Sequence, residues 1–194
     1  MILAFYIFIL NAWKFDFTEE EIKPYIAEIK QAEKLPDLFY ELYNVDNGNS
    51  LEYGTLEYLT KNLLFIKTIA PSSVWIARLM YISKSEYRNY PKILKVELSL
   101  ATKIDKEISA KEQLNFIVQE TNFAMDQIGL KSAAKFYFNK EVKELNSLEM
   151  AKLVVMLRNP SFFNPKRRLE KLNQEAELLL KKFNDHIKFK LKKK

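Results

Sequence analysis

The sequence predicts a mainly α-helical protein, on three observations. Its 194 residues include only three glycines and six prolines, too few turn-forming residues for a sandwich or barrel of short strands. Long stretches are rich in Leu, Lys, Glu and Ala, which favour helices. Apolar residues also recur with a period of 3.6. One such series is Ile93, Val96, Leu100 and Ile104. The length fits one domain with short appendages.

The first 13 residues, MILAFYIFILNAW, are nearly all apolar. They are too short for a membrane span of about 20 residues, and they lack the basic region and cleavage site of a signal peptide. Three interpretations stay open: the end of a membrane anchor, which we favour, an interfacial segment, or a buried strand. Trp13 followed by Lys14 is typical of a segment at a membrane interface.

Capping signals and apolar periodicity place the later elements. The residue pairs that predict helix caps are Thr18 with Glu21, Ser109 with Glu112, and Asn146 with Glu149. The predicted helices and apolar elements cover residues 19–34, 38–43, 55–69, 74–82, 93–104, 109–118, 131–138, 146–158 and 169–189. Residues 44–50, NVDNGNS, form the clearest loop.

Composition excludes several kinds of catalytic site. The chain has no cysteine, so disulfides, thiolate metal sites and cysteine nucleophiles are excluded. Its one histidine, His186, lies in a lysine-rich tail, which argues against a Ser-His-Asp triad or a histidine metal site. Any acid–base chemistry must therefore use Asp, Glu, Lys or Tyr.

The formal net charge is +6, and part of the excess lies in a lysine-rich C-terminal tail. Such a run is usually a solvated tail, and its functional alternative is contact with an anionic membrane surface. No recognised nucleic-acid-binding module accompanies it, so we expect no nucleic-acid partner.

Residues 129–165 hold the most specific pattern in the chain. The segment GLKSAAKFYFNKEVKELNSLEMAKLVVMLRNPSFFNP contains an aromatic cluster at 136–138, which we expect in the core, and it stops at Asn159-Pro160 and Asn164-Pro165. The sequence from Glu97 to Pro165, about a third of the chain, resembles the peptidoglycan glycosyltransferases of family 51, and the match has no gap. This family is the transglycosylase domain of penicillin-binding proteins and of monofunctional transglycosylases. The matching positions are Ser109, Leu114, Phe123, Gly129, Ala134, Tyr137-Phe138, Lys140, Leu145, Glu149, Ala151, Leu153, Pro160 and Asn164-Pro165.

The family's catalytic motifs are only partly present. Its GGSTITQQLAKN motif aligns with residues 53–62, where Lys61 and Asn62 match and the paired glutamines do not. Its RK--E motif places a glutamate at Glu97, but Ile93 and Leu94 stand where Arg-Lys is expected. The ED--F--H motif is absent, because the sequence contains no Glu-Asp dipeptide and no histidine before His186.

The resemblance implies a lysozyme-like transglycosylase fold over residues 14–168, followed by a charged helix and tail at 169–194. It implies a reaction that joins lipid-linked disaccharide units, with the glutamate of the missing motif as base and cations stabilising the pyrophosphate. Glu97 is the remaining catalytic candidate, and Lys61 and Asn62 are the substrate-binding candidates. For the two charged residues the simpler interpretation is an ordinary helix surface. Candidates for a displaced base are Asp37, Glu41, Asp46 and Glu52.

On this resemblance we expect a degenerate transglycosylase-like domain, with catalysis weakened or lost, that binds or scaffolds in the cell envelope. The alternative is an active, divergent glycosyltransferase, and a third hypothesis is a basic interaction module with an unrelated helical fold. The resemblance places the chain at the outer face of the inner membrane. The expected partners are the membrane surface and either lipid-linked peptidoglycan precursor or other envelope proteins. No cofactor is expected, except a divalent metal if the chain is active.

Overall fold

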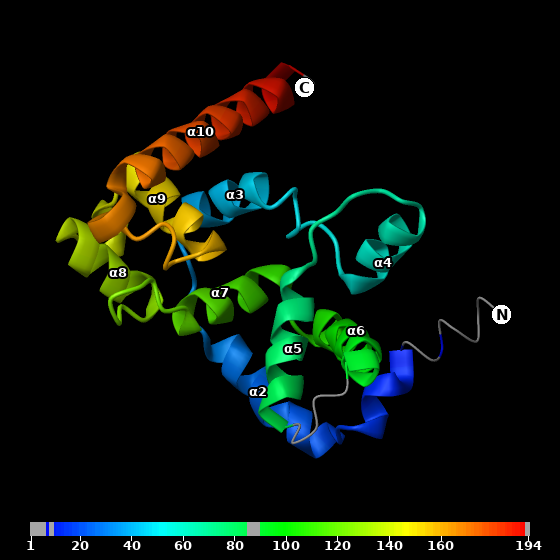
Figure 1. Cartoon of the computed structure of the whole chain (residues 1–194). Coiled ribbons are helices and arrows are strands. Elements are labelled where there is room, and N and C mark those ends of the chain that lie inside the picture. Colours follow the sequence, from blue (N-terminus) through cyan, green and yellow to red (C-terminus); the bar gives the residue numbers. More distant parts are fainter. Residues whose placement is uncertain (1–6, 8–9, 85–89, 193–194) are drawn as a thin grey trace. The chain divides into compact units, whose positions relative to one another are not determined.

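The computed structural model describes residue 7 and residues 10–84 and 90–192. Within them the chain forms helices and no strand, and a single antiparallel bridge joins Asn122 to Ile128. The elements are η1 (Ala12–Phe15), α2 (Glu19–Gln31), α3 (Asp37–Asp46), α4 (Thr55–Leu63), α5 (Ser72–Lys84), α6 (Tyr90–Glu107), α7 (Ala110–Glu120), α8 (Gly129–Phe138), η2 (Val142–Glu144), α9 (Ser147–Arg158) and α10 (Pro165–Lys192) (Figure 1). The mainly α-helical prediction is confirmed.

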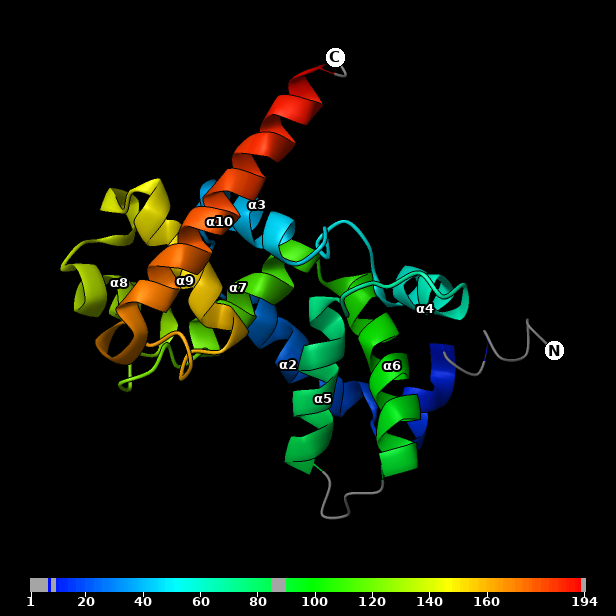
Figure 2. The same cartoon turned by 45° about the horizontal axis from the view of Figure 1, so that its top comes forward.

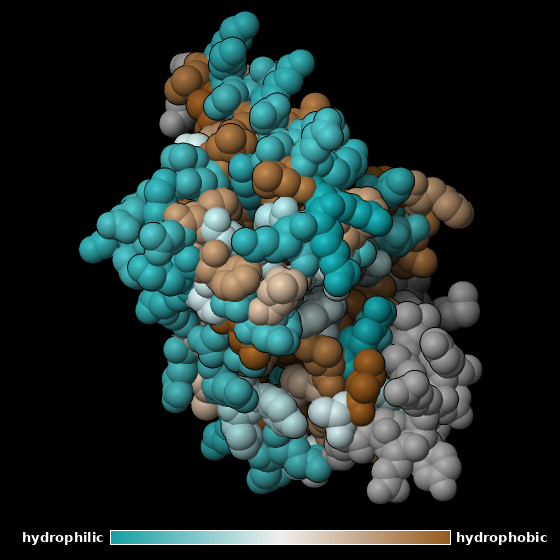
Figure 3. Space-filling view, turned by 60° about the vertical axis from the view of Figure 1, so that its left-hand side comes forward, coloured by the Kyte–Doolittle hydropathy of each residue, from teal (hydrophilic) through white to brown (hydrophobic). Residues whose placement is uncertain are grey.

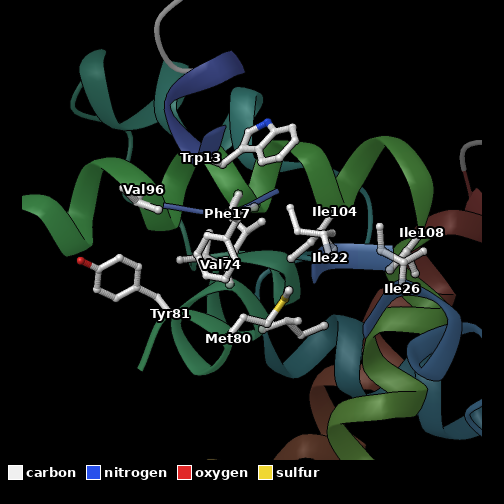
Figure 4. Packing of buried hydrophobic residues seen from close by; sticks show 14 of the residues in the cluster. Trp13, Phe17, Ile22, Ile26, Val74, Met80, Tyr81, Val96, Ile104 and Ile108 are labelled. Atoms are coloured by element: carbon white, nitrogen blue, oxygen red, sulfur yellow. The ribbon is translucent and has the colours of Figure 1, made fainter. Parts of the chain in front are cut away.

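The helices form two compact units, of which the first contains residues 1–32 and 50–117. Its centre is the pair α5 and α6, which lie side by side in both views, with η1 packed against α6 (Figures 1 and 2). Apolar side chains from α2, α5 and α6 meet in its core (Figure 4). Those labelled in the figure include Ile22, Val74, Met80, Val96 and Ile104, and Phe17, from the link between η1 and α2, joins them.

The second unit contains residues 33–49 and 118–194. Here α9 packs against α10 and α3, and α3 also contacts α10. Helix α9 is buried on nearly all sides because its sequence SLEMAKLVVMLR carries apolar residues on several faces. Side chains buried in this unit include Phe39, Leu42, Leu153, Met156, Leu172 and Leu179.

All three predicted capping boxes are confirmed. Thr18 accepts a hydrogen bond from the Glu21 backbone, and Glu21 accepts one from the Thr18 backbone. The pairs at the starts of α7 and α9 form the same reciprocal bonds, which satisfy backbone N–H groups that have no partner inside the helix. These starts were predictable because every partner lies within three residues.

The predicted helix over 55–69 is too long. Helix α4 ends at Leu63, where the N–H of Phe65 bonds to the carbonyl of Asn62 at 3.0 Å and that of Ile66 bonds to Lys61 at 2.9 Å. This 6→1 and 5→2 pattern is a Schellman motif, which places Phe65 in the left-handed region at φ 59°. Glycine usually occupies that position, so the sequence carried no stop signal here.

Two predictions about aromatic residues are wrong. Trp13 is buried in the core of the first unit, where its backbone N–H donates to Ser99 Oγ at 2.8 Å, so it is no interfacial flank. In the cluster at 136–138, Phe136 is exposed and the other two rings are half-buried. The Tyr137 hydroxyl instead donates to the carbonyl of Phe123 at 2.9 Å.

The predicted N-terminal anchor lies largely outside the described residues, which lack 1–6 and 8–9. Among the helices that the structure describes, none combines the length and apolar character needed to cross a membrane.

Candidate active site

Glu97 is a buried carboxylate at the contact between two helices. It lies on α6, beside the core residues Val96 and Leu100, and only 1% of it is exposed. Arg78, on the neighbouring helix α5, donates from Nε to Glu97 Oε2 at 3.1 Å and from Nη2 to Oε1 at 2.9 Å. The Glu97 hydrogen bond and charge raise the pKa of Arg78 above its ordinary value. The two side chains therefore form a bidentate ion pair that joins α5 to α6.

Sequence reasoning missed Arg78. The family pattern directs attention to positions just before Glu97, whereas the actual partner lies 19 residues upstream on another helix. One signal was available: Arg78 is the lone charged residue in the apolar run VWIARLMYI. A charge in such a run needs a partner when the helix is packed on one side.

Lys61, on α4, is bound to its own helix and to a tyrosine ring. Its Nζ lies 2.7 Å from Glu57 Oε1, four residues earlier, and 4.5 Å from the centre of the Tyr53 ring. The Tyr53 hydroxyl donates to the carbonyl of Ile69 at 2.6 Å, and burial raises the pKa of this phenol. Lys61 therefore covers a buried tyrosine while a third of its side chain stays exposed.

Asn62 holds the turn that follows α4. Its side-chain amide donates to the carbonyl of Tyr58 at 2.7 Å and to Thr68 Oγ1 at 3.0 Å. These bonds close the segment between α4 and α5, so the side chain already has a structural role. In the part of the chain that the structure describes, neither Asn62 nor Lys61 bonds directly to Glu97.

Lys61 and Glu97 lie on neighbouring helices of the first unit. Helix α4 contacts α6, the helix that carries Glu97. The three predicted site residues thus share one unit and two neighbouring helices.

Asp105 fixes the start of α4, and sequence reasoning missed this residue as well. Its Oδ2 accepts the Thr55 backbone N–H at 2.6 Å, at a helix N-terminus that favours negative charge. Gly54 favours this approach, because a Cβ there would lie 2.9 Å from Asp105 Oδ2 and the carboxylate would have to shift. Gln113 Nε2 donates to the other carboxylate oxygen at 3.2 Å, so Asp105 positions α4 and thereby Lys61.

The candidates for a displaced base are divided between the two units. Asp37, Glu41 and Asp46 belong to the second unit, and Glu52 belongs to the first. Asp46 is 3% exposed in its side chain and holds the Arg158 guanidinium, so it is engaged within its own unit. Among the described residues, no group of three or more His, Cys, Asp or Glu side chains is placed to hold a metal ion.

Comparison of the sequence with known proteins identifies the family of this chain. The transglycosylase family model matches residues 76–184, which include Arg78 and Glu97 but neither Lys61 nor Asn62. The chain is 29% identical over 110 residues to penicillin-binding protein 4 of Bacillus subtilis strain 168, covering 57% of this chain and 17% of the relative. It is 36% identical over 69 residues to penicillin-binding protein 1A of Neisseria cinerea, covering 36% of this chain and 9% of the relative.

The chain therefore spans less than a fifth of the length of these relatives. The family match itself extends over more than half of the chain and contains the whole segment from Glu97 to Pro165 on which the resemblance was based. This protein belongs to the transglycosylase family, and its helices form that family's lysozyme-like fold.

Proposed function

We propose that this chain is a transglycosylase domain that keeps the fold of its family, with catalysis weakened or lost, and acts as a binding or scaffold module of the bacterial cell envelope. One observation carries the proposal. The glutamate that remains from the catalytic motifs, Glu97, is buried and has both carboxylate oxygens bound to Arg78.

A general base must reach the proton that it removes, within about 2.6–3.2 Å. Glu97 is only 1% exposed, so a sugar hydroxyl can reach it only after the helices rearrange, and a move away from Arg78 would cost the carboxylate its charge partner. The Glu-Asp motif that would supply another base is absent from the sequence. Loss of a positioned base costs roughly 10²–10⁴-fold in rate.

Lys61, the cation that remains from the family's motifs, can bind a ligand, and this supports a binding function more than a catalytic one. Lys61 is partly exposed and pairs with Glu57, a single exposed carboxylate. A pyrophosphate carries more negative charge than one carboxylate, so it would compete well for the Lys61 ammonium. The ligand that we propose is accordingly the lipid-linked disaccharide precursor, held by its pyrophosphate and not polymerised. Other envelope proteins are the second class of partner.

The relatives support the location. They are penicillin-binding proteins of bacteria, which suggests the outer face of the inner membrane for this chain. The proposed domain limits remain residues 14–168 for the transglycosylase-like part and 169–194 for the charged helix and tail.

The alternative is an active, divergent glycosyltransferase, and one observation favours it. Half of the Arg78 side chain is exposed (54%), although the carboxylate that it holds is buried. A guanidinium open to solvent can contact a leaving pyrophosphate, so a substrate that attracts Arg78 would release Glu97.

Binding and turnover can be measured on the same samples. Purified protein is mixed with the lipid-linked disaccharide in detergent, and both the bound precursor and the glycan product are measured. We expect binding without product, and we expect Lys61→Gln to weaken binding about five- to tenfold. The matched control is Lys67→Gln, which removes an exposed lysine from the segment after α4. Equal binding by wild type and Lys61→Gln would remove Lys61 from the site, and polymer formed by wild type would favour the alternative.

A further inference from the structure

Helix α10 carries one apolar stripe that continues beyond the core. Its buried part lies where α10 packs on α9 and α3. The stripe recurs every three or four residues. Its members are Leu172, Ala176, Leu179, Phe183, Ile187 and Leu191. The first three are buried, whereas Ile187 is 37% and Leu191 67% exposed. In Figures 1 and 2 the red end of α10 runs past α3 and α9, and no other described helix of its unit lies beside that end.

The C-terminal end of α10 and the residues after it carry a net charge equal to that of the whole chain. Residues 181–194 hold seven of the 31 basic and one of the 25 acidic side chains. Their formal charge of +6 therefore equals that of the entire protein, and residues 1–180 are neutral overall. The excess is thus concentrated on one short segment.

The lysines border the exposed stripe. At 3.6 residues per turn, Lys190 lies on one side of the line through Phe183, Ile187 and Leu191, and Lys188 lies on the other. Lys181 and Lys192 share the face of Lys188. Figure 3 shows the result at the top of the molecule, where hydrophobic and hydrophilic side chains alternate at the end of α10. This is the pattern of a basic amphipathic helix.

We propose that residues 181–192 lie in the headgroup interface of an anionic lipid bilayer. Ile187 and Leu191 then enter the acyl boundary, while the bordering lysines extend to the lipid phosphates. Charge complementarity selects this partner, and the apolar stripe distinguishes it from nucleic acid, whose phosphates would engage the lysines and leave the stripe exposed. The proposal rests on the envelope location given above, but vesicle binding requires neither precursor binding nor turnover, so the two can fail separately.

The test uses the full chain and sedimentation with vesicles of phosphatidylcholine, alone or with about 30% phosphatidylglycerol. We expect binding only to the anionic vesicles, and we expect it to weaken as salt is raised. The triple variant K181Q/K188Q/K192Q should lower the partition coefficient on the order of 100-fold, because each lysine near an anionic leaflet contributes about fivefold. I187Q/L191Q should lower it at least about tenfold by removing apolar insertion.

The matched control is K106Q/K135Q/K143Q, which removes the same charge from exposed positions on other helices. It should change the partition coefficient less than about threefold. Circular dichroism checks that each variant keeps its helix content. The proposal is overturned if wild type ignores anionic vesicles, if the control loses as much binding as the α10 variant, or if I187Q/L191Q binds as wild type does. Tighter binding to a nucleic acid duplex than to anionic vesicles would also overturn it.

Discussion

The guanidinium of Arg78 donates to both carboxylate oxygens of Glu97, at 3.1 and 2.9 Å, across the contact between α5 and α6. Arg78→Gln should lower the free energy of unfolding by about 1–3 kcal/mol, because it leaves the carboxylate of Glu97 buried without its charge partner. Solvent screening at the half-exposed arginine keeps the loss below the value for a fully buried pair. Urea unfolding measures the change.

Arg78→Lys provides the matched comparison for this pair. It keeps the positive charge but loses the planar fork that reaches both oxygens, so its effect should lie between wild type and Arg78→Gln. A loss under about 0.3 kcal/mol in Arg78→Gln would show that the pair does not hold the two helices together.

Phe65 stands where a Schellman motif usually has glycine, at φ 59°, and it is 97% exposed. Phe65→Gly should raise the free energy of unfolding by about 0.5–1 kcal/mol, because glycine adopts this conformation without steric cost and almost no packing is lost. Leu64→Gly, one residue earlier at φ −87°, should instead lower it by a few tenths. A lower melting temperature for Phe65→Gly than for wild type would show that the left-handed backbone of Phe65 is not strained.

Asp46 joins α3 to α9 through Arg158, whose Nε donates to Asp46 Oδ2 at 2.7 Å. Arg158 also donates from Nη1 to Glu175 Oε2 on α10 at 3.0 Å. Asp46→Ala should cost about 2–4 kcal/mol, because the Asp46 side chain is buried and its loss leaves Arg158 without its main partner. Glu175→Ala should cost only about 0.5 kcal/mol, since this carboxylate is more exposed. Equal costs in guanidinium unfolding would contradict this ranking.

Glu112 makes the stability of α7 depend on pH. Hydrogen bonds from the Ser109 hydroxyl and backbone lower the pKa of this carboxyl below its ordinary 4.5. A lowered folded-state pKa stabilises the fold above pH 4.5, and this contribution is lost as the pH falls through the folded-state value. Glu112→Gln should therefore be less stable than wild type at pH 7, by about 0.5–1 kcal/mol, and the difference should shrink at pH 3. A difference that is the same at both pH values would contradict the linkage.

The parts of the fold that the sequence predicted correctly depend on short-range signals. The caps at Thr18, Ser109 and Asn146 were placed correctly because each partner is three residues away. Apolar periodicity likewise located the helices, although not all of their ends. The end of α4 was missed because Phe65 adopts a backbone conformation that its residue type disfavours.

The candidate site was less predictable, because its contacts join residues that lie far apart in the sequence. Motif alignment proposed Glu97, but the pairing with Arg78 depends on how α5 and α6 pack, which no local pattern records. Asp105, which fixes the start of α4, lies 50 residues from Thr55 in the sequence. Whether Glu97, Lys61 and Asn62 act on a substrate stays a prediction.

The amount of glycan polymer formed from lipid-linked disaccharide by the purified chain tests the central claim most directly. Wild type should form no more polymer than Glu97→Gln, because the carboxylate is bound to Arg78 and the family's Glu-Asp motif is absent. Glu28→Gln, an exposed glutamate on α2, is the matched control and should behave identically. Polymer formed by wild type and Glu28→Gln but lost in Glu97→Gln would contradict the account and identify Glu97 as a working base.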